Sequence, residues 1–179
     1  MLVSVAAVAA LHVVRPDLDP AQRRLSEYAV GASGWLMTLA FVAVAGGSWS
    51  LRRSIAAWPG LGPVRVLLAV AAVGMLASAA FETDVTTPAA PRELVHSAVS
   101  STAFASLVLA MLWTSTVARA AIAWSIPRAV PDAVTAMAAL GAVLGPIAHD
   151  GPWTGLVQRL TWLAVMVWLL LLTRAASRR

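Results

Sequence analysis

Three histidines lie beside acidic residues in the polar stretches that separate long apolar segments. His12 ends the first apolar segment, His96 opens the fourth and His149 follows the fifth. An imidazole next to a carboxylate can transfer protons as a general acid/base pair, or bind a metal that the carboxylate helps to orient. The three histidines are therefore the candidate metal ligands, although the sequence assigns no cofactor. The plainer alternative is that ionisable side chains gather in these loops because water is there.

The loop FETDVTTPAAPRELVHS supplies the first candidate catalytic pair. It places Asp84 after one apolar segment and His96 at the start of the next. Both residues would lie at one membrane surface, where either Asp84 or Glu27 could exchange a proton with His96. His96, Asp84 and Glu27 are the candidate catalytic residues. Alternatively, His96 shares a helix face with Ser100 and only belongs to a polar patch.

The loop HVVRPDLDPAQRRLSEY is a second polar stretch, in which two prolines restrict the backbone around Asp17 and Asp19. We expect it to form an ordered lid rather than a slack tether. Ser26 suits the N-cap of the helix that follows. The candidate ligand-binding residues of this loop are Asp17, Asp19 and Tyr28.

The last apolar segment opens with GLVQRLTW, so that Gln158 and Arg159 fall inside it. A charge costs about 2.5 to 3.5 kcal/mol at the centre of a bilayer and less near its surface. Arg159 should therefore pair with Asp84 or Glu27, or else bind an anionic head group through its planar guanidinium. Both residues are candidate ligand-binding residues. We expect one cavity lined by Asp17, Glu27, Asp84, His96, Gln158 and Arg159.

The elements that must position these residues are membrane helices. The 179-residue chain is 60% hydrophobic and 12% charged, against about 25% charged in a soluble domain. No apolar segment alternates with period two, which excludes a strand barrel. The sequence predicts one all-α domain over residues 1–179, a transmembrane bundle of about six helices. Their expected ranges are 1–14, 29–51, 63–81, 95–118, 130–148 and 155–173. The first spans only about 21 Å of a core about 30 Å thick, so it is incomplete or begins upstream.

Charge predicts how the bundle is oriented. All 13 basic residues are arginines. Eight of them lie with one aspartate in the second loop, the fourth loop and the C-terminus, whereas five lie with seven acids in the other loops. If all six segments span, the positive-inside rule places both termini in the cytoplasm of a multi-pass cell-membrane protein. If the short first helix does not cross, the N-terminus lies outside and every later loop keeps its side. Sidedness explains the arginines better than a nucleic-acid partner, and membrane lipid is the expected partner.

Small residues predict helix contacts, and missing residue types exclude some chemistry. Gly141 and Gly145 form a GxxxG pattern, while Gly74 and Ser78 form a second small pair, and both faces should touch neighbouring helices. The chain has no cysteine, which excludes disulfides, thiolate nucleophiles and iron-sulfur clusters. No nucleophile elbow, phosphate-binding loop or HExxH motif is present.

Three stretches together resemble a known family: RPDLDPAQRRLSEYA running into Gly34-Trp35, FETD with the downstream His96, and GLVQRLTWLAVMVWLLLL. They are similar to the prokaryotic membrane family catalogued as domain of unknown function 998. The likeness covers nearly the whole chain, although the family has an aromatic-Pro-Thr-Asp where this chain has Phe81-Glu82-Thr83-Asp84. The resemblance implies about six helices and membrane residence, and it supplies no reaction.

Two functions remain open. The first is a membrane protein whose outward-facing polar pocket binds a lipid head group, an isoprenoid or another amphiphile. The second is a small intramembrane enzyme that uses the His/Asp/Glu cluster for hydrolysis or isoprenoid cyclisation of a lipid-soluble substrate. Haem ligation is weaker, because the histidines lie at helix ends. No charge deep in a helix marks a transport pathway.

Overall fold

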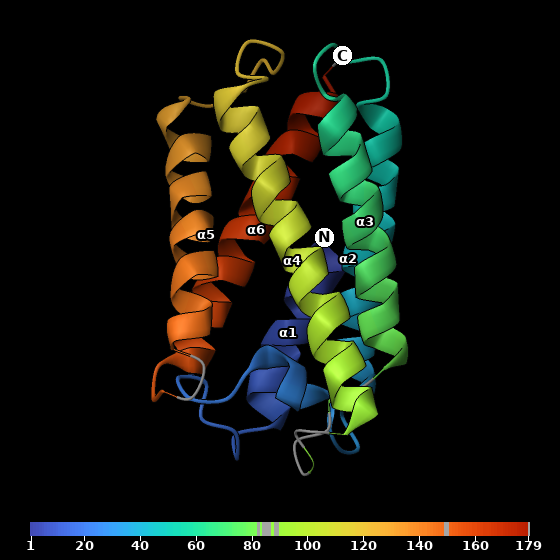
Figure 1. The fold of residues 1–179 in the computed structure, drawn as a ribbon, viewed down its shortest axis with the longest axis vertical. Helices are drawn as coiled ribbons and strands as arrows, with labels where there is room; N and C mark the ends of the chain where they lie inside the picture. The colour runs from blue at the N-terminus through green and yellow to red at the C-terminus, as the bar shows by residue number, and fades with distance from the viewer. Residues whose placement is uncertain (82, 84–86, 88–89, 149–150, 179) are drawn as a thin grey trace.

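The computed structural model describes residues 1–81, 83, 87, 90–148 and 151–178, and over these residues the chain is an all-α bundle (Figure 1). The helices α2, α3 and α4 pack side by side, and α5 packs on α6. The helices are α1 Leu2–Val14, α2 Trp35–Ser54, α3 Gly62–Ala80, α4 Pro91–Thr116, α5 Ala129–Ile147 and α6 Thr154–Ala176, with a short 3-10 helix η1 at Leu25–Ala29.

Four of these helices, α3 to α6, are long and apolar enough to cross a membrane. The helix α1 has 13 residues and is too short, as its sequence predicts. Its start lies at about half the height of the bundle (Figure 1). The helix α2 has 20 residues but ends in Arg52 and Arg53, which lower its apolar character. The fold therefore has the character of a transmembrane α-bundle.

The second helix begins later than predicted. Residues 25–29 form η1, and α2 starts only at Trp35. Between them Gly31 has a φ of +98°, and a Cβ on Gly34 would lie 1.8 Å from the carbonyl oxygen of Ala29. A turn this tight cannot be part of a continuous helix. The prediction that Ser26 caps α2 is wrong, since Ser26 lies within η1 and Gly34 is the N-cap.

The fourth helix begins earlier than predicted, at Pro91 rather than residue 95. Proline is favoured in the first helical turn because its missing N–H would be unpaired there anyway. This extension adds a turn that carries Glu93 on the same side as His96, three residues further on. The turn matters for the site described below.

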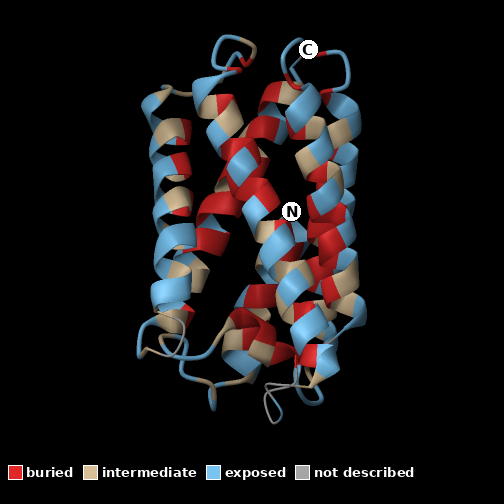
Figure 2. Cartoon of the chain, viewed as in Figure 1, coloured by how far each residue is buried: buried red, intermediate tan, exposed pale blue. Residues whose placement is uncertain are grey.

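Small residues set the closest helix contacts. A Cβ on Gly74 of α3 would lie 2.9 Å from the backbone oxygen of Val99 in α4, and one on Gly141 of α5 would lie 1.9 Å from Thr161 Oγ1 in α6. These contacts confirm that both glycines face neighbouring helices. The Gly145 Cβ position meets nothing within 4 Å, so only half of the GxxxG pattern is a contact. Buried residues concentrate on α6 and on the inward faces of α2, α3 and α4 (Figure 2).

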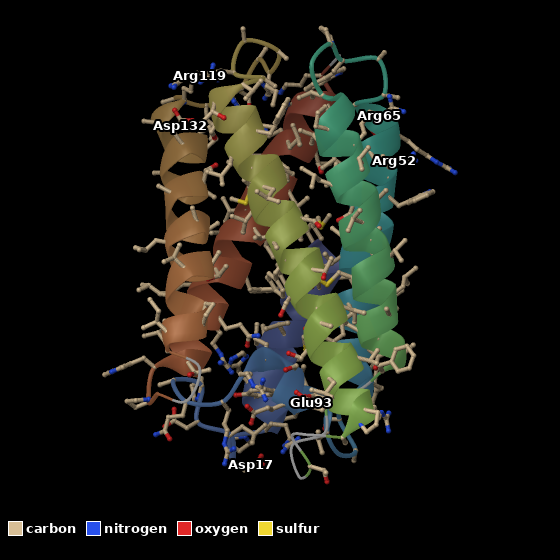
Figure 3. The ribbon with its side chains drawn as sticks, in the orientation of Figure 1. Asp17, Arg52, Arg65, Glu93, Arg119 and Asp132 are labelled. Atoms are coloured by element: carbon tan, nitrogen blue, oxygen red, sulfur yellow. The ribbon has the colours of Figure 1, made fainter. Side chains whose placement is uncertain are left out.

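The charged residues lie at the two ends of the bundle. Arg52, Arg65 and Arg119 lie at one end, with Asp132, whereas Asp17 and Glu93 lie at the other (Figure 3). We call the first the arginine end and the second the first-loop end, because the segment 15–34 closes it. The helices thus bring the two predicted sets of loops to opposite ends.

Candidate functional site

A cavity of about 450 Å³ lies between α4, α5 and α6 near the first-loop end. The wall that α4 contributes is polar near the first-loop end and apolar farther along the helix. The residues from Glu93 to Ser101 that face it are polar, whereas Phe104, Ala105 and Val108 further along the helix are apolar. The wall on α5 consists of small or compact residues, including Gly141 and Ala142. The site therefore has a polar end and an apolar interior.

His96 is the most informative residue of the polar end. Its side chain is 2% exposed, and its Nδ1 lies 2.5 Å from the carbonyl oxygen of Phe81. A carbonyl oxygen can only accept, so Nδ1 carries the proton and Nε2 of the neutral ring presents a lone pair. Nε2 is buried and has no hydrogen-bond partner among the described residues. A buried, unpaired acceptor on a cavity wall is costly unless a ligand or water pairs with it.

Glu93 lies beside His96 on α4 and is also buried, at 6% exposed. Its Oε2 accepts a 2.6 Å hydrogen bond from Thr83 Oγ1, and its Oε1 lies 3.8 Å from Arg24 Nη2. Sequence reasoning missed Glu93 as a site residue because residue 93 was placed before the helix. The signal that could have found it is the three-residue spacing to His96 that follows a helix-starting proline.

Gln158 connects the cavity to the first loop. Its Oε1 accepts a 2.6 Å hydrogen bond from the backbone N–H of Leu25 in η1. This bond holds η1 over the end of the cavity, so that Arg24 and Ser26 also line it. The expected ordered lid is therefore present as η1 and its flanking residues.

A second, inner cavity of about 30 Å³ is lined by residues of α1, η1 and α2 together with residues of α3, α4 and α6. It is large enough for a water molecule, which needs roughly 10 to 15 Å³ and two or more polar partners. His96 and Gln158 line both cavities. Ser4 of α1 also lines the inner one, and its buried hydroxyl has no partner among the described residues. Most of the other residues that line the inner cavity are apolar, including Met37, Phe41 and Val44 of α2.

Arg159 points to a different neighbourhood. Its Nε donates to Nε2 of His12 over 2.8 Å, and its Nη1 donates to the backbone oxygens of Arg23 and Gly155 over 2.6 and 3.0 Å. The guanidinium carbon lies 5.2 Å from the ring centre of Tyr28, within range of a cation-π interaction. The expected pairing of Arg159 with Glu27 is wrong, and no other described carboxylate forms a salt bridge with it.

The acids of the first loop stabilise the loop itself. Glu27 lies 3.3 Å from Arg23 and 3.4 Å from Arg24. Asp17 accepts hydrogen bonds from Arg15 through both carboxylate oxygens, and these bonds lower the pKa of Asp17. Asp19 accepts from the backbone N–H of Ala21 over 2.8 Å, a turn-forming contact.

The six residues expected around one cavity therefore divide into separate groups. His96 and Gln158 line the large cavity, whereas Asp17, Glu27 and Arg159 line neither cavity. Asp84 and His149 fall outside the described residues. Among the residues that the structure describes, no three His, Asp or Glu side chains gather as metal ligands would. What the large cavity offers instead is hydrogen bonding at one end and apolar contact at the other.

Comparison with known proteins places the chain in a family whose function is unknown. The model of the family described as protein of unknown function DUF998 matches residues 1–175, so the chain belongs to that family. No curated protein and no solved structure matches the chain.

Proposed function

We propose that this member of a family of unknown function binds an amphiphile, in the cavity between α4, α5 and α6. The polar head would lie against His96 and Gln158, and the chain would lie along Phe104 and Val108. The candidate ligands are membrane lipids and lipid-soluble small molecules. A volume of about 450 Å³ lies within the range of roughly 300 to 1,000 Å³ usual for small-molecule sites.

The observation that carries the proposal is the unpaired Nε2 of His96. It is buried at the wall of a cavity whose polar residues give way to apolar ones with depth. A purely structural histidine would use its second nitrogen within the protein, because an unpaired buried acceptor costs about 1 to 3 kcal/mol. A ligand with a polar head and an apolar chain would relieve this cost and also fill the interior.

The opening of the cavity favours a ligand that arrives from the membrane. Ser101 and Ala105 on α4 and Ala142 and Pro146 on α5 line the cavity and are exposed. The mouth therefore lies between these two helices, on the side of the bundle rather than at its tip. Both are among the helices apolar enough to span a membrane, so this side would face lipid.

The orientation of the protein is part of the proposal. With the arginine end in the cytoplasm, as the positive-inside rule favours, the chain is a multi-pass protein of the cell membrane. The polar end of the cavity then lies near the outer surface. An amphiphile would enter from the outer half of the bilayer.

A matched pair of variants on α4 tests the binding proposal. Ala105→Trp would fill the cavity, whereas Leu109→Trp changes an exposed residue of the same helix that does not line it. Lipids extracted from the purified proteins would be identified by mass spectrometry. We expect one amphiphile enriched in wild type and Leu109→Trp and lost in Ala105→Trp. Equal lipid content in all three proteins would contradict the proposal.

A second candidate function is an intramembrane enzyme, and the position of Glu93 favours it. His96 Nε2 could take a proton from water, while Glu93 lies one helical turn away on the same helix. In a hydrolysis, water would add to an ester carbonyl of the bound lipid, and an acid and an alcohol would leave. Incubation with lipid esters distinguishes the two functions: an enzyme releases products that His96→Gln fails to release, whereas a binding protein returns the lipid unchanged.

A further inference from the structure

We infer that the cavity selects a long-chain alcohol, of the alkyl or isoprenoid type, over amphiphiles with a phosphate head. This inference rests on the proposed function and names the ligand class. It follows from the hydrogen-bonding capacity and the charge of the polar end.

Among the described residues, the polar end offers an unpaired ring acceptor and an amide donor, beside the hydroxyl groups of Ser26, Ser97 and Ser101. The acceptor is Nε2 of His96, whose other nitrogen is committed to the backbone oxygen of Phe81. The donor is the side-chain amide nitrogen of Gln158, because the amide oxygen already accepts from Leu25. This nitrogen is not fully buried, and it donates no hydrogen bond to a described residue. A hydroxyl group donates one hydrogen bond and accepts others at the same time, so it can satisfy both side chains.

The charge of the polar end disfavours an anionic head. Arg24 is the cation that lines the cavity, and it already lies near the carboxylates of Glu27 and Glu93, at 3.4 and 3.8 Å. Glu93 itself lines the cavity, so a phosphate would approach a buried carboxylate. Arg159, the nearest cation on α6, is turned toward His12. Among the described residues, the two charges that line the cavity, Arg24 and Glu93, balance each other, and a neutral head fits them best.

The residues beyond the polar end fit a single apolar chain. Phe104, Ala105 and Val108 continue the α4 wall, and Ala142 and Gly145 leave space on the α5 side. Since the mouth opens between these two helices, the chain of the alcohol can extend through it toward the surrounding lipid.

The test uses two photoactivatable probes in the full-length protein reconstituted in lipid nanodiscs. One is a sixteen-carbon alcohol that carries a diazirine in its chain, and the other is its phosphate monoester. Labelled peptides are mapped by mass spectrometry. We expect the alcohol to label peptides of α4, α5 and α6, and the phosphate probe to label them about tenfold less, the factor for one hydrogen bond to a buried group.

Two variants locate the effect. His96→Phe removes the ring acceptor and keeps a planar ring, and Gln158→Glu keeps the oxygen that accepts from Leu25 but replaces the amide donor with a carboxylate. Each should lower alcohol labelling about tenfold. His12 lines neither cavity, so His12→Gln should leave alcohol labelling unchanged. Thermal unfolding in detergent shows whether each cavity variant folds. If one of them does not, the other still decides the outcome.

The results separate this inference from the function on which it rests. Equal or stronger labelling of the cavity by the phosphate probe would overturn the inference and leave amphiphile binding standing. Absence of cavity labelling by both probes would overturn the proposed function itself. Alcohol labelling that neither His96→Phe nor Gln158→Glu changes would also overturn the inference.

Discussion

Arg159 on α6 donates a hydrogen bond to the ring of His12 on α1, with Nε 2.8 Å from Nε2. The opposite ring nitrogen of His12 lies 2.7 Å from the backbone oxygen of Val8, which can only accept. His12 therefore carries its proton on Nδ1 and uses Nε2 as the acceptor. This relationship ties the short first helix to the last one at the first-loop end.

Loss of the His12 acceptor should destabilise the bundle. In His12→Leu, the Nε–H of Arg159 loses its partner in a half-buried position, at a cost of about 1 to 3 kcal/mol. His12→Gln retains a side-chain acceptor and should cost less. Thermal unfolding in detergent, followed by tryptophan fluorescence, measures both. Equal midpoints for wild type and His12→Leu would show that the bond contributes nothing to stability.

Removal of the Gln158 acceptor should loosen η1. In Gln158→Leu the backbone N–H of Leu25 loses the 2.6 Å bond that holds the loop, at about 1 to 3 kcal/mol. Hydrogen-deuterium exchange should then rise in peptides that contain residues 25–29. Gln158→Glu preserves an acceptor and should exchange as slowly as wild type. Faster exchange in both variants would mean that the amide oxygen is not what holds the loop.

The two glycines of the GxxxG pattern should respond differently to the same change. Gly141→Ala places a methyl group 1.9 Å from Thr161 Oγ1, whereas Gly145→Ala meets nothing within 4 Å. Overpacking of a tight contact costs about 1 to 3 kcal/mol, so Gly141→Ala should unfold at a lower temperature. Gly145→Ala should match wild type. A larger effect at Gly145 would contradict the observed packing of α5 on α6.

The orientation of the bundle can be tested without changing its charges. The chain contains no cysteine, and Ala32 and Ala57 are both exposed, in the loops at opposite ends. A membrane-impermeant maleimide applied to intact cells should label Ala32→Cys. It should label Ala57→Cys only after the membrane is permeabilised, because the arginine end is expected in the cytoplasm. The reverse pattern would overturn the proposed orientation.

The sequence by itself determined the class of the fold and the ends at which its charges lie. Long apolar segments must form helices in a bilayer, since their backbone groups have no water to bond. Because the loops alternate between two ends, the order of the chain already separates Asp17 from Arg52. Gly74 and Gly141 could be assigned to helix contacts for a similarly local reason, since only small residues permit backbones to approach closely.

Tertiary structure decided how the polar residues are grouped. Gln158 and Arg159 are adjacent in sequence, but successive side chains on a helix point about 100° apart. One therefore faces the cavity and the other faces His12. Which neighbour each one meets depends on how η1 folds over the bundle, and this follows from the turn at Gly34 rather than from helix periodicity.

The partner of Arg159 shows the physical reason most directly. The cost of a charge in the membrane predicted a carboxylate partner for Arg159. Instead its Nε donates to the imidazole of His12 and its Nη1 to backbone oxygens, while its Nη2 is buried without a partner among the described residues. The availability of these acceptors depends on where the loop backbone passes, which no side-chain pattern encodes. Glu93 entered the site in the same way, through a helix start at Pro91 that brought it beside His96. The sequence determines which polar side chains are present. The packing of the first loop against the helices determines which groups they contact.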